Sequence, residues 1–476
     1  MGTTTDSEPR PQEFDVVVVG GGPGGYATAL YGAAAGLSIA MVEKDKVGGT
    51  CLHRGCIPAK EFLETASVFR TVATAKEFGI DARQPSIDFS VSLDRKQKVV
   101  DQLFRGLSGL LKHRTVTTVP GVGELQVDHS VRVTSPDGTT TVLRGKNIVL
   151  AAGSVPRSIP GFDIDGERVL SSDEVLELSS LPKSVAVIGC GAIGCEFASM
   201  MSDLGSQVTM LEALPTILPG CDQEVADVVL RSFKKRGIDV HTGVAVRGHD
   251  PKKRGTTVLF GDNERVEVDA VVVSVGRRPL SEGLLAEGAG VDLDDSGFVK
   301  VDTFMRTSAP GVYAVGDLVA TPQLAHVGFA EGILVIKEIL GETAIPVDYE
   351  KVPWCIYCHP EVAFAGLTED AALARGFDVV VQRDPFGGNG RARILGETDG
   401  LVKVIAERGE DGRAGRLLGV HMVGPWVTEQ LGQAYLAVNW EATPDEIGQF
   451  IQPHPSLSET FGETVLALTG RGLHVG

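Results

Sequence analysis

Residues 14–25 read FDVVVVGGGPGG, and residues 184–194 read SVAVIGCGAIG. Each stretch is a short apolar, β-branched run that leads into a G-x-G-x-x-G turn and then into a run of small, helix-forming residues. The turn glycines are Gly20, Gly22 and Gly25 in the first copy and Gly189, Gly191 and Gly194 in the second. A strand, a tight glycine turn and a helix N-terminus in this order bind the pyrophosphate of a dinucleotide. The chain is therefore predicted to hold two dinucleotides.

An acidic residue follows each turn at the same distance. Glu43 ends the next strand eighteen residues after Gly25 (43 − 25), and Glu212 stands eighteen residues after Gly194 (212 − 194). A carboxylate at this position accepts the ribose hydroxyls, whereas a 2′-phosphate requires Arg or Lys. Glu212 therefore favours NAD over NADP.

A second similarity follows further along each copy. The apolar strands at residues 148–153 and 271–276 end in Gly153 and Gly276, and a proline follows each strand. This pattern indicates an internal duplication. Two dinucleotide sites in one chain suggest electron transfer between two cofactors, and FAD with NAD is the economical pairing.

Length and composition limit the function classes. A chain of 476 residues exceeds one hydrophobic core and predicts three or four domains. The formal charge of −18 argues against nucleic acid and anionic membrane as partners, and no run approaches the roughly 18 apolar residues that span a bilayer. Residues 1–13 are polar and resemble neither a secretory signal nor a transit peptide. We expect a soluble cytoplasmic protein.

The seven cysteines are few and odd in number, so a disulfide is expected to be catalytic rather than structural. Cys51 and Cys56 lie in the stretch GTCLHRGCIPAK at residues 49–60. Residues five apart rise about 7.5 Å along an ideal helix, whereas the Cα atoms of a disulfide rarely lie more than about 6.8 Å apart. A bridge would therefore require a distorted first turn, for which Gly55 and Pro58 are suitable.

Spacing alone does not select this pair, because Cys190 and Cys195 are also five residues apart. Cys190 lies inside the second glycine turn and Cys195 in the helix that follows, where buried packing is expected. Cys355 and Cys358 form a C-x-x-C without the second pair of a zinc site, so we predict no metal.

Dithiol oxidation needs a base, because only the thiolate attacks a disulfide. His454 has a carboxylate, Glu459, five residues on (459 − 454), and a histidine oriented by an acid suits this role. The other His-Pro pair, at His359, has Phe364 at that offset (359 + 5). We interpret His359 as structural.

Residues 49–60, both glycine turns and the string HPSLSE at 454–459 resemble the pyridine nucleotide-disulfide oxidoreductase family, and the similarity runs from about residue 14 to residue 470. The resemblance implies an α/β fold with two Rossmann-like domains, one for FAD and one for NAD, and a C-terminal α+β dimerisation domain. The expected boundaries are a flexible leader at 1–13, the first part of the FAD domain at 14–153, the NAD domain at 154–276, an FAD-binding central segment at 277–348 and the dimerisation domain at 349–476.

The resemblance also implies roles for the residues around the cysteines. Cys56 would be the sulfur next to the flavin, where it forms a charge-transfer complex, and Cys51 would be the thiol that meets the substrate. Lys60 would lie near the flavin N5 and pair with Glu196. The family usually has Ser or Thr where this chain has Ala59.

A further flavin element is expected at residues 311–317, an apolar strand that ends in Gly-Asp. The resemblance implies that Asp317 contacts the ribityl chain and that the helix beginning near Ala325 directs its N-terminal amides at the flavin pyrimidine. The complete prediction assigns Gly20, Gly22, Gly25, Glu43, Gly153, Asp317 and Ala325 to FAD, and Gly189, Gly191, Gly194, Glu212 and Gly276 to NAD.

The expected activity is the oxidation of protein-bound dihydrolipoamide with reduction of NAD. The resemblance implies that the dyad of His454 and Glu459 acts on the disulfide of the other subunit of a homodimer, although Gln452-Pro453 departs from the usual residues before it. The partners would be the lipoyl domains of a 2-oxo acid dehydrogenase complex or of the glycine cleavage system. A glutathione reductase-like activity is disfavoured by Glu212, and a mercuric reductase-like one by the lack of a cysteine after Cys358. The intact pair and dyad argue against a catalytically idle structural flavoprotein.

Overall fold

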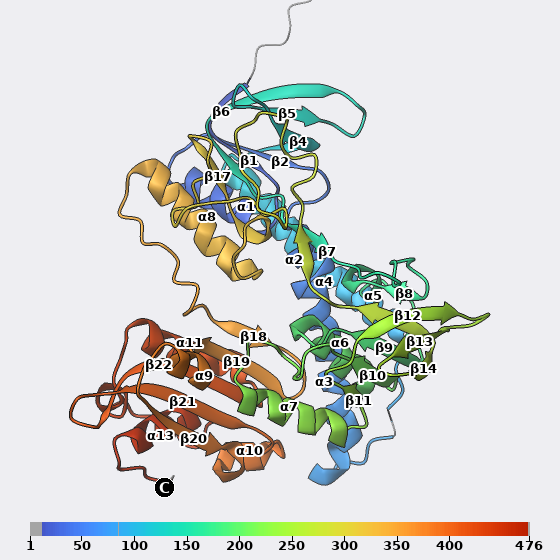
Figure 1. The fold of residues 1–476 in the computed structure, drawn as a ribbon, viewed down its shortest axis with the longest axis vertical. Coiled ribbons are helices and arrows are strands. Elements are labelled where there is room, and N and C mark those ends of the chain that lie inside the picture. Colours follow the sequence, from blue (N-terminus) through green and yellow to red (C-terminus); the bar gives the residue numbers. More distant parts are fainter. Residues whose placement is uncertain (1–11, 84, 475–476) are drawn as a thin grey trace, which may run out of the picture. The chain divides into compact units, whose positions relative to one another are not determined.

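The computed structural model describes residues 12–83 and 85–474, which form two compact units (Figure 1). Of the described residues, the first unit contains 12–59, 94–156 and 277–347. The second contains 60–83, 85–93, 157–276 and 348–474. Residues 1–11 of the expected leader lie outside the described residues, and residues 12 and 13 already belong to the first strand.

The first unit is built on a seven-stranded sheet in the order β3-β2-β1-β6-β5-β4, with β17 paired to β6. Strands β3, β2, β1, β6 and β17 are parallel, whereas β4, β5 and β6 form an antiparallel meander. The strands are β1 (Gln12–Val19), β2 (Ile39–Glu43), β3 (Thr117–Pro120), β4 (Val122–Leu125), β5 (Ser130–Thr134), β6 (Thr140–Leu150) and β17 (Val312–Ala314). The helices are α1 (Pro23–Ala34), α2 (Gly49–Arg54), α4 (Phe89–His113), which begins in the second unit, the 3-10 turn η2 (Gly316–Leu318) and α8 (Ala325–Leu340). A short antiparallel pair, β7 (Ser154–Pro156) with β16 (Arg277–Pro279), completes the unit.

Helices α1 and α8 approach each other closely because glycines line their contact. A Cβ atom on Gly332 would lie 2.8 Å from the carbonyl oxygen of Gly24, and one on Gly24 would lie 3.0 Å from Val315. The close packing brings the segment before α8 beside the glycine turn that begins α1.

The second unit contains a parallel sheet in the order β11-β10-β9-β15-β8 and a separate antiparallel sheet of β12, β13 and β14. The strands are β8 (Val169–Leu170), β9 (Ser184–Ile188), β10 (Gln207–Leu211), β11 (Asp239–His241), β12 (Val246–Pro251), β13 (Thr256–Phe260), β14 (Glu264–Val268) and β15 (Ala270–Val273). The helices are α3 (Cys56–Thr74), which begins in the first unit, the 3-10 turn η1 (Ala75–Phe78), α5 (Ser172–Val175), α6 (Ala192–Asp203) and α7 (Gln223–Lys235).

The same unit ends in an antiparallel sheet in the order β18-β19-β22-β21-β20. Its strands are β18 (Trp354–Ile356), β19 (Glu361–Gly366), β20 (Val379–Pro385), β21 (Leu401–Arg408) and β22 (Ala414–Gly424). The helices are α9 (Glu369–Ala374), the 3-10 turn η3 (Phe386–Gly388), α10 (Gly390–Leu395), α11 (Val427–Asn439), α12 (Pro444–Ile447) and α13 (Glu459–Leu468).

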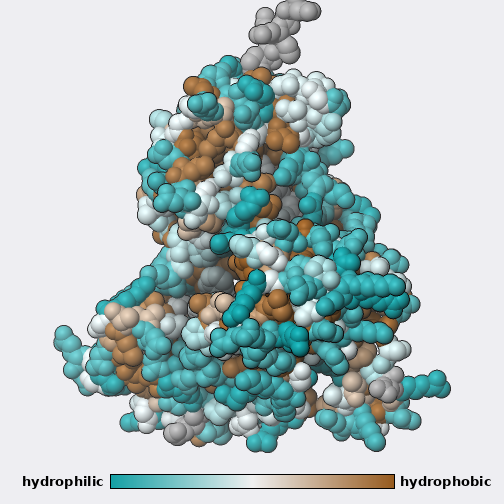
Figure 2. All heavy atoms as spheres, turned by 45° about the vertical axis from the view of Figure 1, so that its right-hand side comes forward, coloured by the Kyte–Doolittle hydropathy of each residue, from teal (hydrophilic) through white to brown (hydrophobic). Residues whose placement is uncertain are grey.

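The predicted fold class, two dinucleotide-binding α/β folds with a C-terminal α+β domain, is confirmed. Within residues 12–83 and 85–474, no helix combines the length and the apolar character that crossing a membrane requires. Hydrophilic residues cover most of the visible face in Figure 2, and apolar residues form separate patches on it.

Candidate active site

The first glycine of each predicted turn has a backbone conformation and a close neighbour that only glycine accommodates. Gly20 has a φ of +109°, and a Cβ atom there would lie 2.2 Å from the carbonyl oxygen of Ala151. Gly189 has a φ of +93°, and its Cβ atom would lie 2.6 Å from the carbonyl oxygen of Ser274. Any side chain would therefore clash with the neighbouring strand as well as strain the backbone.

The remaining turn glycines divide into two kinds. A Cβ atom on Gly25 or Gly194 would lie within 2.0 Å of the first glycine's carbonyl oxygen, so these positions close the turn. A Cβ atom on Gly191 would meet nothing within 4 Å, and one on Gly22 would meet only the backbone at 4.0 Å. The open space lies at the N-termini of α1 and α6, neither of which has a side-chain cap. The two cradles therefore fit a pyrophosphate, whose oxygens accept hydrogen bonds from free helix N–H groups.

The two acidic residues make matching contacts. The carboxylate of Glu43 accepts hydrogen bonds from the backbone N–H groups of Gly21 at 2.7 Å and Asp45 at 2.8 Å. Glu212 accepts them from the corresponding amides of the second copy, at 2.6 Å and 2.9 Å. A carboxylate has about four acceptor positions, so each acid keeps capacity for ribose hydroxyls while the backbone holds it in place.

A cavity of about 520 Å³ opens beside Glu43 in the first unit. The remaining lining residues are Asp45, Lys46, Val47, Phe104, Ser108, Leu111, Lys112, Thr115, Val116, Thr118, Val119 and Pro120. Its size is in the range of nucleotide-sized ligand sites, and Glu43 at its edge matches the adenosine end of a dinucleotide. Burial raises the pKa of the Glu43 carboxyl group, and its backbone hydrogen bonds oppose that effect.

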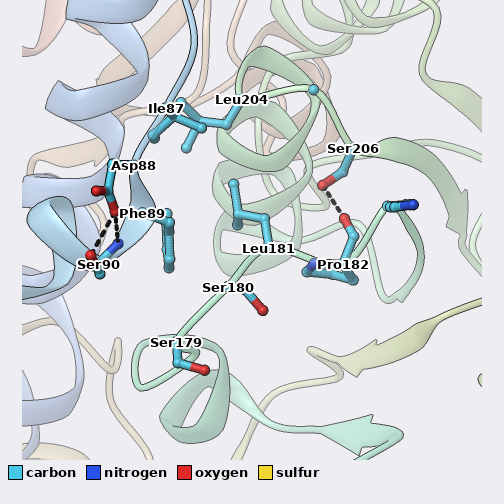
Figure 3. A pocket seen from close by; sticks show the side chains of 12 residues that line it. Ile87, Asp88, Phe89, Ser90, Ser179, Ser180, Leu181, Pro182, Leu204 and Ser206 are labelled. Carbon is cyan, nitrogen blue, oxygen red and sulfur yellow. Dashed lines mark hydrogen bonds between the residues drawn. The ribbon is translucent and has the colours of Figure 1, made fainter.

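Another cavity, of about 550 Å³, lies in the second unit among residues 87–90, 179–183 and 204–206 (Figure 3). The labelled side chains are serines, apolar groups and one carboxylate, Asp88, which accepts hydrogen bonds from Ser90. The Ser206 hydroxyl donates to the carbonyl oxygen of Pro182 at 2.6 Å. None of the predicted site residues lines it.

Asp317 lies in the 3-10 turn η2 that follows β17, where a hydrogen-bond network fixes one of its carboxylate oxygens. The Ser154 hydroxyl donates to Asp317 Oδ2 at 2.5 Å, and the Arg277 Nε–H donates to that hydroxyl at 2.7 Å. The fully buried Glu331 accepts from the backbone N–H of Gly316 at 2.6 Å, which holds the same turn from the other side. The sequence analysis missed Ser154 and Arg277, because no local sequence pattern links residues that are more than 120 positions apart.

A buried amide nitrogen without a hydrogen-bond partner in the described structure lies just before α8. The Nε2 atom of Gln323 is buried and has no hydrogen-bond partner among the described residues. It immediately precedes Leu324, the N-cap of α8, and Ala325 is the first helical residue. A buried donor next to free helix N–H groups fits the polar edge of a flavin. Gly153 and Gly276 both have left-handed backbone conformations with open space beside them.

The helix that carries the predicted redox pair is interrupted between the two cysteines. Helix α2 ends at Arg54, Gly55 has a φ of −146° and a ψ of −113°, and α3 begins at Cys56. The distortion that the five-residue spacing requires is thus present. Cys51 and Cys56 are partly exposed. Burial first, and then the charges of these two cysteines, raise the pKa of the Tyr26 phenol in α1 to about 12.

The second pair with the same spacing has a different environment. Cys190 and Cys195 are fully buried, and the Cys195 thiol donates to the carbonyl oxygen of Cys190 at 3.3 Å. Burial raises the pKa of both thiols, so neither forms the reactive thiolate at neutral pH. No cluster of three or more His, Cys, Asp or Glu side chains that could hold a metal ion occurs in the described part of the chain.

The structure brings Lys60 and Glu196 together. The Lys60 ammonium lies 2.9 Å from both carboxylate oxygens of Glu196, which is buried. Tyr357 contributes a second contact to each: its backbone N–H donates to Glu196 at 2.9 Å, and its ring centroid lies 4.9 Å from the Lys60 nitrogen. Sequence reasoning missed Tyr357.

The structure also brings His454 and Glu459 together. His454 Nδ1 lies 2.9 Å from Glu459 Oε2, while the histidine side chain is 72% exposed and the carboxylate 14% exposed. The side chain of Gln452 packs over Gly462, which anchors the segment before the histidine on α13. His359, by contrast, is kept neutral: burial first, then Arg70 and Arg236, lower its pKa to about 3.

A cysteine pair at an interrupted helix adjoins one dinucleotide fold, and a second dinucleotide fold follows in the same chain. This combination defines a disulfide oxidoreductase that works with two nucleotide cofactors. The chain belongs to the pyridine nucleotide-disulphide oxidoreductase family, whose model matches residues 14–332 and whose dimerisation-domain model matches residues 352–465. The cofactors of this family are FAD and NAD, and both cradles fit them.

Relatives and solved structures agree with this assignment. The chain is 40% identical to a dihydrolipoyl dehydrogenase of Bacillus subtilis, over 97% of this chain and 99% of that one. It is 36% identical to mitochondrial dihydrolipoyl dehydrogenase 1 of Arabidopsis thaliana, over 97% and 92%. The crystal structure of LpdA from Mycobacterium tuberculosis superposes with a TM-score of 0.90 at 27% identity, over 96% and 99% of the two chains. The HOCl-induced flavoprotein disulfide reductase RclA of Escherichia coli gives 0.85 at 27% identity, over 95% and 99%.

Proposed function

We propose that this chain is a dihydrolipoyl dehydrogenase, which oxidises protein-bound dihydrolipoamide to lipoamide and reduces NAD. The observation that carries the proposal is the 2.9 Å contact between His454 Nδ1 and Glu459. It commits Nδ1 to the carboxylate and leaves Nε2 on an exposed ring to take a proton from a substrate thiol. The dihydrolipoyl dehydrogenases of other organisms, at 35–40% identity over nearly the whole chain, support it.

The proposed chemistry runs through the chain's own residues. His454 deprotonates one substrate thiol, the thiolate attacks Cys51, and the bond between the cysteines breaks to release Cys56 as a thiolate. The second substrate sulfur attacks the mixed disulfide and closes the lipoamide ring, and its proton passes to the Cys51 sulfur, which is released as a thiol. FAD would be held by the turn of Gly20, Gly22 and Gly25, and it would supply the two-electron chemistry that links the cysteine pair to NAD. Glu196 holds the Lys60 ammonium, which we propose lies at the flavin.

We further propose a homodimer in which the dyad of one subunit serves the cysteine pair of the other. The chain contains the family's dimerisation domain. Large apolar side chains are exposed along α11 and in the segment that leads to His454, where a second copy would cover them. They are Trp426, Leu436, Trp440, Phe450 and Ile451. The proposed partners are lipoyl domains of a 2-oxo acid dehydrogenase complex or the glycine cleavage system, in the cytoplasm, where NAD is available.

The activity is tested by comparing two reactions of the purified dimer. We expect rapid NAD reduction by dihydrolipoamide and little NADPH oxidation by glutathione disulfide. Failure of the first reaction in FAD-loaded protein would refute the proposed substrate. Rapid glutathione-dependent oxidation of NADPH would favour the glutathione reductase-like alternative.

The cofactor assignment gives a paired prediction. Glu212→Gln is expected to raise the KM for NAD about tenfold, because an amide has one oxygen and cannot accept from both backbone N–H groups and the ribose. FAD content, measured from the ratio of flavin to protein absorbance, should stay at the wild-type level. Glu43→Gln is the matched control: it should lower FAD content and leave the KM for NAD unchanged in the flavin-loaded fraction. The reverse pattern would show that the two sites are exchanged.

A further inference from the structure

Asn389 is a buried residue that holds two segments of the C-terminal domain together. It is the N-cap of α10, where its Oδ1 atom accepts a hydrogen bond from the backbone N–H of Ala392 at 2.9 Å. Its Nδ2 atom donates to the carbonyl oxygen of Ser456 at 2.9 Å, to Thr460 Oγ1 at 3.0 Å and to Glu459 Oε1 at 3.3 Å. The side chain therefore connects the cap of α10 with the loop that carries His454 and with Glu459, the first residue of α13.

The orientation of this amide is determined by its surroundings. Turning it over would place Oδ1 against the Ser456 carbonyl oxygen and the Glu459 carboxylate, which are both acceptors, and would remove the cap of α10. The N–H groups of Asn389 must therefore face the loop. Only 8% of the residue is exposed, so water offers these groups little alternative.

The two oxygens of Glu459 have different partners. Oε1 accepts from Asn389, and Oε2 contacts His454 Nδ1. Contacts on both oxygens resist rotation of the carboxylate, whereas a contact on Oε2 alone would leave it free to turn about its last bond. His454 is 72% exposed and has little packing of its own to orient it. The direction of its ring therefore depends on the direction of the carboxylate.

We propose that Asn389 is a positioning residue for the proton transfer: it fixes Glu459, and Glu459 fixes the imidazole. This inference rests on the proposed function of the dyad. Holding the loop does not by itself make a residue a positioning residue. Gln433 also holds the loop, by donating to the carbonyl oxygen of Ser458 at 3.1 Å, but its contact is with the backbone and not with the Glu459 carboxylate.

Two substitutions test the proposal. Asn389→Asp keeps the size and the cap acceptor but removes both N–H donors, and Asn389→Ala removes the whole amide. We expect either variant to lower kcat for dihydrolipoamide oxidation about tenfold, the effect of losing one hydrogen bond to a charged group, with KM little changed. NADH-driven reduction of ferricyanide should keep the wild-type rate, because that reaction takes no proton from a substrate thiol.

The matched control removes an equivalent cap elsewhere. Thr368 is the N-cap of α9, a six-residue helix like α10, and its hydroxyl accepts from the backbone N–H of Ala371 at 3.1 Å. Thr368→Ala should turn over dihydrolipoamide at the wild-type rate. A comparable loss of kcat in Thr368→Ala would attribute the effect to capping and overturn the positioning role.

The remaining outcomes separate this inference from the proposed function. Wild-type kcat in Asn389→Asp and Asn389→Ala, with His454→Gln inactive, would overturn the role of Asn389 alone. Wild-type kcat in His454→Gln as well would overturn the proposed function of the dyad. If neither Asn389 variant yields a folded flavoprotein while Thr368→Ala does, Asn389 is a structural residue and the inference is overturned.

Discussion

Cys56→Ser is expected to abolish NAD reduction by dihydrolipoamide, with a loss of at least about a thousandfold. A serine hydroxyl cannot form a disulfide, so the protein can no longer accept two electrons from the substrate at this site. Steady-state NADH formation measures the loss. Thiol titration of the denatured wild-type protein should find two more thiols after reduction than before, that is seven against five (7 − 2).

The chain supplies its own control for the cysteine pair. Cys195→Ser changes a cysteine of the pair with the same spacing, and the hydroxyl can still donate to the carbonyl oxygen of Cys190 as the thiol does. This variant should retain activity and the thiol difference. A folded Cys195→Ser protein that is as inactive as Cys56→Ser would contradict the assignment of the redox pair.

His454→Gln is expected to lower the rate of dihydrolipoamide oxidation by about 10²- to 10⁴-fold, the usual contribution of a general base. Glutamine can still donate a hydrogen bond to Glu459 but cannot take a proton from the substrate thiol near neutral pH. NADH-driven ferricyanide reduction should continue at the wild-type rate. Loss of both reactions together would indicate that the substitution damages the cofactor sites rather than the base.

His359→Gln is the control for the base, since His359 precedes the other proline of this kind. The residue is half-buried, and its pKa of about 3 means that the neutral imidazole is too weak a base to accept a proton near pH 7. We expect normal dihydrolipoamide turnover with a modest fall in melting temperature. A loss of turnover equal to that of His454→Gln in a folded protein would falsify the interpretation of His359 as structural.

The dinucleotide folds were predictable because their requirements are local. Gly20 and Gly189 need a left-handed backbone and no side chain, and a strand and a helix must adjoin them in sequence. The apolar run that precedes the second glycine turn is the strand Ser184–Ile188. The first strand begins at Gln12 instead of Phe14, because pairing with β6 extends it into polar residues that carry no strand pattern of their own.

The contacts in the site that join residues far apart in the sequence were not predictable from local patterns. Lys60 and Glu196 are 136 residues apart, and only resemblance to a family related them. Asn389 lies 70 residues before Glu459 and belongs to no motif that marks it. Its proposed role depends on the loop before α13 lying against the start of α10, and the tertiary packing of the domain determines that contact.

The sequence by itself determined the two dinucleotide turns, their acids and the candidate cysteines and histidine, because glycine conformation, strand alternation and residue spacing are properties of neighbouring residues. The placement of Cys190 and Cys195 in the second glycine turn and its helix already predicted that this pair is buried, and the tertiary structure supplied the physical difference between the two pairs of equal spacing. Cys190 and Cys195 are buried, with thiol pKa values raised by desolvation, whereas Cys51 and Cys56 lie at a broken helix and are partly exposed. Burial depends on the whole fold, so spacing cannot encode it, and burial is what separates an inert thiol from a reactive one.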